Sequence, residues 1–112
     1  MTTRVRKVMW TEKSVRDLKA QVDYILERNG EAARRVAERI RRAGNELGRS
    51  AIGRPGHRLG TYERVLPGLP YILVYTLDPA REAVIILHVY HGAQNWRGPE
   101  SREGGGPEPV KK

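Results

Sequence analysis

Three histidines are the side chains best suited to proton chemistry near neutral pH: His57, His88 and His91. His57 lies in a glycine-rich segment and has no ligand partner nearby in the sequence. His88 and His91 are three residues apart in an apolar run that reads as a strand. Successive strand side chains point to opposite faces, so these two cannot bind one metal together. We therefore expect neither a metal site nor a cofactor.

His91 is the candidate for acid–base catalysis, because it ends its predicted strand beside Gly92 and could face solvent. It would need a partner, and Glu63, Arg64 and Arg58 on an earlier predicted strand are the candidates. No cysteine and no Gly-x-Ser-x-Gly motif is present, which excludes thiol and serine-elbow nucleophiles. The enzyme class left open is a metal-independent ribonuclease, in which Arg58 and Arg64 would stabilise phosphate charge while His91 transfers a proton.

The composition restricts the class of partner. The 112 residues make one domain, with 21 Lys and Arg against 13 Asp and Glu and a formal net charge of +8. Such a surface favours nucleic acid or an acidic protein, the alternative being a basic surface that serves only solubility. No run of residues is apolar enough to span a bilayer, and no secretory signal precedes the domain. The absence of cysteine is compatible with a cytoplasmic protein.

Hydrophobic periodicity predicts the first half of the chain. Residues 4–10 read as a strand and Thr11 as a helix N-cap. A helix follows from Glu12 and stops at Asn29-Gly30, and a second helix runs from about Glu31 to Leu47. The apolar stripe of the first helix comprises Val15, Leu18, Val22, Ile25 and Leu26. The stripe of the second comprises Ala33, Val36, Ala37, Ile40, Ala43 and Leu47. A connection this short predicts an antiparallel helical hairpin.

Three further strands are predicted after a loop at residues 48–57. They cover residues 58–66, 71–77 and 83–90, with turns at Pro67-Gly68 and Asp78-Pro79. The first has Arg58, Tyr62, Arg64 and Leu66 on one face, and Leu59, Thr61, Glu63 and Val65 on the other. The other two are apolar on both faces and should be central. The fold class is therefore α+β: an N-terminal strand, a two-helix antiparallel hairpin and a three-stranded antiparallel meander form one sheet with the helices on one face.

Two helices can cover only one face of a four-stranded sheet. Part of the other face, apolar and edged by Arg and Tyr, should need a cover from outside the fold.

This order of elements carries four sequence stretches that resemble the RelE/ParE toxin superfamily of type II toxin–antitoxin systems. The stretches are Gly-Arg-Pro-Gly (53–56), Gly-Thr-Tyr-Glu-Arg (60–64), Pro-Gly-Leu-Pro-Tyr-Ile-Leu-Val-Tyr (67–75) and Val-Tyr-His-Gly-Ala-Gln-Asn-Trp (89–96). The resemblance assigns residues 1–97 to a toxin domain. Residues 98–112 form a charged tail rich in Gly and Pro, which we expect to be disordered.

The resemblance implies a cytoplasmic toxin neutralised by a cognate antitoxin, an acidic small protein that lays an extended or helical segment over the toxin. A hetero-oligomer with that antitoxin is expected. The partner-binding candidates are Arg58, Tyr62, Arg64, Tyr90, His91 and Trp96.

The superfamily divides by target, and the resemblance favours the ParE-like branch, which poisons DNA gyrase. The alternative is a RelE-like endonuclease that cleaves mRNA on the ribosome. The positions of the RelE phosphate-binding cations are occupied here by Glu63, Val65, Ile72 and Gln94 or Ala93. A third alternative is an inactive homologue that acts only as a binding partner.

Overall fold

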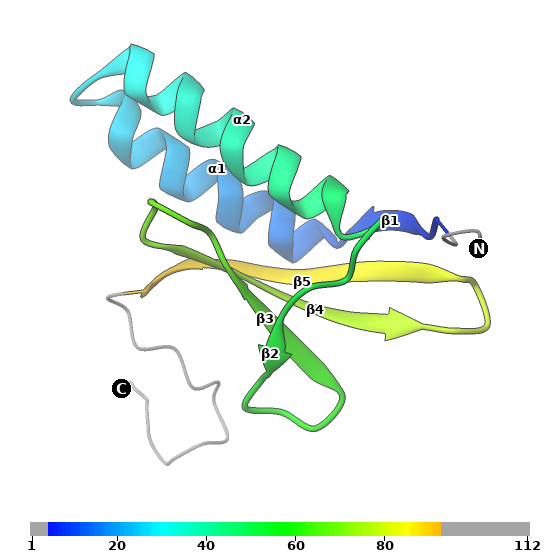
Figure 1. The fold of residues 1–112 in the computed structure, drawn as a ribbon. Coiled ribbons are helices and arrows are strands. Elements are labelled where there is room, and N and C mark those ends of the chain that lie inside the picture. Colours follow the sequence, from blue (N-terminus) through cyan, green and yellow to red (C-terminus); the bar gives the residue numbers. More distant parts are fainter. Residues whose placement is uncertain (1–4, 93–112) are drawn as a thin grey trace.

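The computed structural model describes residues 5–92, and its elements form a helical hairpin on one side of a mixed sheet (Figure 1). The helices are α1 (Glu12–Leu26) and α2 (Gly30–Glu46). The strands are β1 (Lys7–Trp10), β2 (Arg54–Pro55), β3 (Thr61–Val65), β4 (Tyr71–Asp78) and β5 (Ala83–His91). The predicted α+β fold class is confirmed.

Each helix begins at a side-chain cap. Thr11 accepts a hydrogen bond from the Ser14 backbone N–H, as predicted. Asn29 accepts hydrogen bonds from the N–H groups of Glu31 and Ala32 and so starts α2. The first helix was predicted to stop at Asn29-Gly30, but it ends at Leu26 with Glu27 as its C-cap. Asn29 instead caps α2, of which Gly30 is the first residue.

The sheet has the order β1-β5-β4-β3-β2. β3, β4 and β5 form the predicted antiparallel meander, and β1 pairs in parallel with β5. The parallel pairing requires a crossover, which the helical hairpin supplies. β4 and β5 are central, as their two-sided apolar sequences predicted.

Three boundaries differ from the sequence prediction. The sheet has five strands, because two residues of the predicted loop, Arg54 and Pro55, pair with Glu63 and Tyr62 as β2. The strand predicted over 58–66 is shorter, because Arg58 belongs to the tight β2–β3 turn, where its carbonyl accepts from Thr61. The first strand begins at Lys7 in the described part of the chain.

The core lies between the helices and one face of the sheet. Its buried members are Ile40, Leu47, Leu66, Tyr71, Leu73, Tyr75, Val84, Ile86 and Val89. Val74 and Tyr90 are also buried but lie outside this cluster, on the opposite face. Two members of the predicted α1 stripe are exposed, Val15 by 51% and Leu26 by 55%. That prediction was wrong for both, because the apolar stripe of α1 is wider than the surface that α2 and the sheet cover.

Asp17 joins α1 to the part of β5 that extends past β1. Its carboxylate accepts a hydrogen bond from the Val89 N–H at 3.1 Å, which satisfies an amide at the open strand edge. Lys13 donates to the same carboxylate, and His88 Nδ1 lies 3.8 Å from it. Burial raises the pKa of Asp17, but these neighbours outweigh it and hold the pKa below its ordinary value.

None of the helices in residues 5–92 is long and apolar enough to cross a membrane.

We predict that Gly44→Ala destabilises the fold by about 1–3 kcal/mol, the usual cost of overpacking a core. A Cβ on Gly44 would lie 2.5 Å from Trp10 Cζ2 and 2.8 Å from Ile86 Cδ1. The control is Gly30→Ala, where a Cβ meets only Leu26 Cδ1 at 3.7 Å. This variant should be stabilised, because alanine lowers the conformational entropy of the unfolded chain. Urea unfolding of both variants measures the difference, and equal midpoints would contradict the close approach.

We predict that Asp17→Asn costs about 1 kcal/mol at pH 7, because a neutral acceptor replaces a charged one. Since the folded-state pKa of Asp17 is lowered, its contribution is present above the unfolded value and is lost as pH falls below about 4. The difference in unfolding free energy between wild type and variant should therefore narrow as the pH falls below about 4. The control is Asp23→Asn, which breaks the exposed pair with Lys19 and should change little. A gap that stays constant with pH would contradict the assignment.

Candidate functional site

Tyr62 and Arg64 lie on β3 and face the helices. The Tyr62 ring stacks on Tyr75, a member of the buried core, with centroids 5.6 Å apart. Arg64 is half-buried and its side chain lines a groove with α2. The Tyr75 phenol has a raised pKa because of burial, so it remains neutral near pH 7 and cannot act as a base.

His91 and Tyr90 end β5 and point to opposite faces. His91 is half-buried and meets the edge of the Tyr71 ring, with centroids 5.3 Å apart. Tyr90 is 7% exposed on the face away from the helices, and its hydroxyl lies 3.4 Å from Glu63 Oε2. Tyr90 therefore supports a buried polar contact and has little surface to offer a partner.

The remaining predicted residues lie elsewhere. Arg58 is exposed in the β2–β3 turn, and Trp96 is outside the described residues. β3 runs antiparallel to β4, so Arg58 precedes the end of β3 that pairs with Thr76, whereas His91 pairs with Tyr71 at the opposite end of the sheet.

The three ribonuclease candidates do not converge in this fold. At about 3.3 Å per residue, Arg58 and His91 are separated by more than about 15 Å along the strands. Arg64 is nearer to His91. Two strand spacings across the sheet and two residues along the strand place their Cα atoms about 12 Å apart. His91 and Arg64 together can approach one ligand only through their side chains, and Arg58 cannot join them.

Glu63 makes a polar cluster that the sequence did not predict. Its side chain is 5% exposed and accepts from Arg54 Nε at 3.1 Å, while Arg54 Nη2 lies at 3.0 Å. The alternation along β3 correctly placed Glu63 on the face opposite Arg64. The missing information was β2, which brings Arg54 directly opposite Glu63 in the register.

An apolar groove separates the two helices on their outward side. It has a volume of about 570 Å³ and is lined by Trp10, Val15, Leu18, Val22 and Ala37, with Lys19, Arg41 and Asn45 at its polar border. Asn45 accepts a hydrogen bond from Trp10 Nε1 at 3.1 Å, which fixes the indole at one end. Val15, which is 51% exposed, and the small side chain of Ala37 both line this groove.

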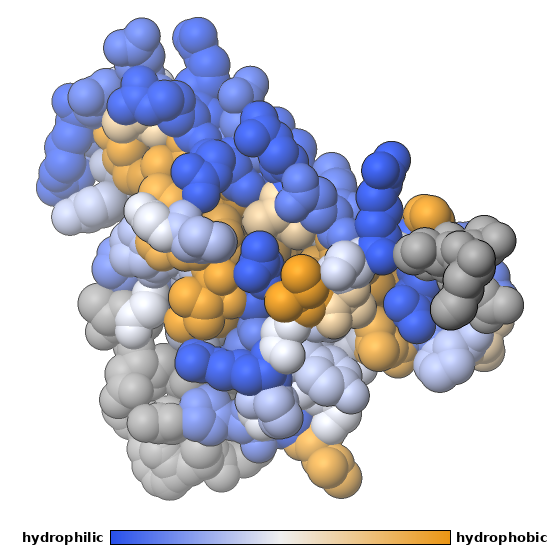
Figure 2. All heavy atoms as spheres, viewed as in Figure 1, coloured by the Kyte–Doolittle hydropathy of each residue, from blue (hydrophilic) through white to orange (hydrophobic). Residues whose placement is uncertain are grey.

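A second groove runs over the C-terminal half of α2 toward β3, with a volume of about 840 Å³. Arginines supply much of its lining, from α2, the turn after it and β3: Arg41, Arg42, Arg49 and Arg64. Figure 2 shows hydrophilic residues over the outward surface of α2, with hydrophobic residues gathered between the helices and the sheet. Of these four arginines, the sequence prediction singled out only Arg64, as a candidate for phosphate and partner binding.

No group of three His, Asp or Glu side chains comes together within residues 5–92 to hold a metal ion.

Known proteins resemble this chain in both sequence and fold. Residues 8–96 match the family model described as ParE toxin of the type II toxin–antitoxin system parDE. The Sinorhizobium fredii protein "Putative toxin Y4kP" is 37% identical over 92 residues, which cover 81% of this chain and 93% of that protein.

Two solved structures share the fold at low identity. The chromosomal ParDE system from P. aeruginosa has a TM-score of 0.72 and 23% identity, covering 79% of this chain and 97% of the other. The RelBE2 toxin–antitoxin complex from Mycobacterium tuberculosis has a TM-score of 0.54 and 24% identity, covering 80% and 94%. Since the family model spans most of the chain and the sequence relative exceeds 30% identity, this chain belongs to the ParE toxin family of type II toxin–antitoxin systems.

Proposed function

We propose that this toxin inhibits DNA gyrase and is neutralised by a cognate acidic antitoxin. The observation that carries the choice of gyrase over mRNA is Glu63. In the RelE-like ribonucleases that the sequence resembles, this position belongs to a cation that binds phosphate. Here the position holds a carboxylate that is 5% exposed and ion-paired to Arg54. An anionic carboxylate cannot bind an anionic backbone.

The distribution of the other candidates supports the same choice. A ribonuclease needs its acid and its phosphate-binding cations within reach of one phosphodiester. His91 packs edge-on against Tyr71, and Arg58 lies at the other end of the sheet. A toxin that works by binding needs no such convergence.

The apolar groove between α1 and α2 is the best candidate for the antitoxin site. Trp10, Val15 and Val22 form an apolar floor, while Lys19 and Arg41 stand at its border. An amphipathic segment could bury its apolar side chains there and place its carboxylates near these cations. Both solved relatives come from toxin–antitoxin systems, which supports a partner of this kind.

We predict that the purified toxin, freed of antitoxin, blocks gyrase supercoiling and increases the amount of cleaved gyrase-bound DNA. Plasmid supercoiling assays with toxin in excess measure both effects. Unchanged gyrase activity, together with codon-biased cuts in translated mRNA, would overturn the proposal in favour of the endonuclease.

The variant His91→Ala is the control for that choice of target. Gyrase inhibition does not need an imidazole acid, so a folded His91→Ala toxin should arrest growth as the wild type does. Loss of toxicity in a variant whose melting temperature is unchanged would favour the endonuclease. Absence of growth arrest by the wild type itself would favour a homologue that only binds.

We predict that Val15→Asp weakens antitoxin binding by about tenfold or more, because it places a like charge against an acidic partner in the groove. The matched control is Leu59→Asp, which makes the same chemical change at the fully exposed tip of the β2–β3 turn. Titration calorimetry of both variants with the antitoxin measures the difference. Equal affinities would show that the antitoxin binds elsewhere.

A further inference from the structure

The groove over the C-terminal half of α2 has a chemistry distinct from that of the apolar groove. Four arginines and two glutamates line it, giving a local charge of +4 − 2 = +2: Arg41, Arg42, Arg49, Arg64, Glu38 and Glu46. Of its apolar members, Leu47 is only 1% exposed and so offers no surface to a ligand, whereas Ile52 is 53% exposed.

Within residues 5–92, the side chains of the four groove arginines make no hydrogen bond or ion pair. Elsewhere, Arg54 pairs with Glu63, Arg39 donates to the Pro67 carbonyl at 2.7 Å and Arg28 covers the Tyr24 ring. By contrast, no carboxylate in the described chain comes within 4 Å of the four groove guanidinium groups.

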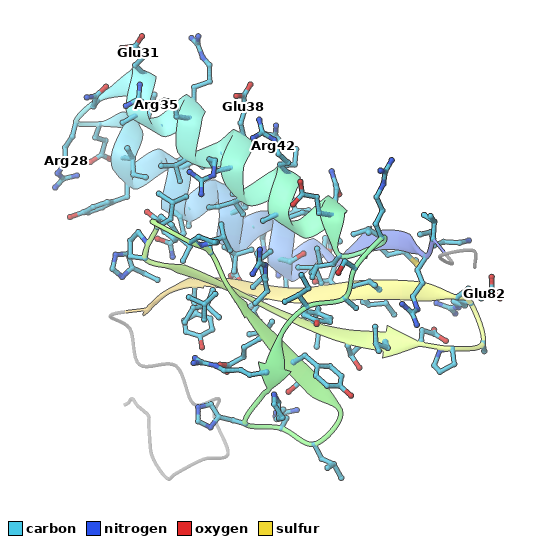
Figure 3. The ribbon with its side chains drawn as sticks, viewed as in Figure 1. Arg28, Glu31, Arg35, Glu38, Arg42 and Glu82 are labelled. Carbon is cyan, nitrogen blue, oxygen red and sulfur yellow. The ribbon has the colours of Figure 1, made fainter. Side chains whose placement is uncertain are left out.

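Glu38 and Arg42 illustrate the point. They are four residues apart on α2, a spacing that often forms an ion pair. Figure 3 shows both projecting from the outer side of the helix, and they do not form one. The Arg42 guanidinium is therefore available to an external anion.

The spacing of the arginines suits a repeating anion. Arg49 continues the helical path beyond α2, since its N–H donates to the Glu46 carbonyl at 3.0 Å. Arg42 and Arg49 are thus separated by about 10 Å along the helix axis. Two cations this far apart cannot both bind one phosphate group, so together they suit a polymer that carries several phosphates.

A phosphate backbone suits the groove better than an acidic protein does. The core of a protein interface is depleted of charged residues and carries several apolar anchors, whereas this lining has four arginines and one large exposed apolar side chain, Ile52. Arginine forks bind phosphate oxygens in a bidentate manner and require no apolar surface. The two glutamates limit the attraction, so the affinity should lie in the range of non-specific binding, roughly 10⁻⁴ to 10⁻⁶ M.

We propose that the groove formed by Arg41, Arg42, Arg49 and Arg64 binds the phosphodiester backbone of a nucleic acid. This goes beyond the proposed inhibition of gyrase and does not depend on it. It gives the toxin a second binding surface, bordered by Arg41 and Asn45, which also line the apolar groove.

The test is fluorescence anisotropy of the full-length toxin, freed of antitoxin, with a labelled 20-base-pair DNA duplex and with a single-stranded RNA of equal length. The variant is Arg42→Gln with Arg49→Gln. It should reduce the slope of log affinity against log salt by about 2 and weaken binding at least about tenfold at 0.1 M salt. The relative affinities for duplex and RNA then identify the source of the backbone.

The matched control is Arg34→Gln with Arg35→Gln, which removes the same charge from the same helix outside the groove. It should change affinity less than about twofold, and unchanged melting temperatures verify that both variants are folded. Equal losses in the two variants would overturn the proposal, because binding would then follow net charge alone. No binding of either polymer by the wild type at 50 mM salt would also overturn it. The proposal would also be overturned if the groove variant kept its affinity for nucleic acid but no longer bound the antitoxin.

Discussion

The arrangement of the molecule depends on how closely α2 approaches the sheet at Gly44. The Trp10 ring and Ile86 occupy the space that a side chain at this position would need. This contact lets Ile40 and Leu47 reach the core on either side of it, where both are fully buried. Because α2 is fixed at this point, its two flanks have fixed positions as well. One forms the apolar groove with α1, and the other leads over the arginines toward β3.

Glu63 is the position on which the proposed target depends most, and its carboxylate is buried in the sheet. A buried carboxylate is unfavourable unless it is paired, and breaking such a pair by removing one partner is strongly destabilising. Arg54 supplies the charge and Tyr90 a polar hydroxyl, so the cluster connects β2, β3 and β5 on the face away from the helices. A cation at this position would leave Arg54 facing a like charge. The structure of this face therefore favours a carboxylate over a cation at position 63.

The fold could be predicted from the sequence wherever periodicity and capping agree. Thr11, the two-sided apolar strands and the Pro67-Gly68 turn, where Gly68 has φ 76°, all fall where predicted. β2 could not be predicted, because two residues carry no periodicity and their pairing depends on β3. The exposure of Val15 could not be predicted either, since an amphipathic stripe indicates which side of a helix is apolar but not how much of it the neighbours cover.

The candidate site was harder to predict than the fold, because it depends on how the elements pack against one another. Tyr62, Arg64 and His91 lie on the strands where they were expected, yet tertiary packing engages Tyr62 and His91 with aromatic neighbours and leaves Arg64 beside α2. From the sequence alone, the arginines of α2 indicate only a solvated helix surface. The other two arginines of the groove are distant in the sequence, because Arg49 lies beyond the helix and Arg64 follows fifteen residues later. Only the folded chain brings Arg64 of β3 to the same groove as the arginines of α2. The basic residues behind the net charge of +8 therefore have two different roles. Arginines such as Arg39 and Arg54 stabilise the fold, while those of the groove keep their hydrogen-bonding capacity for a ligand.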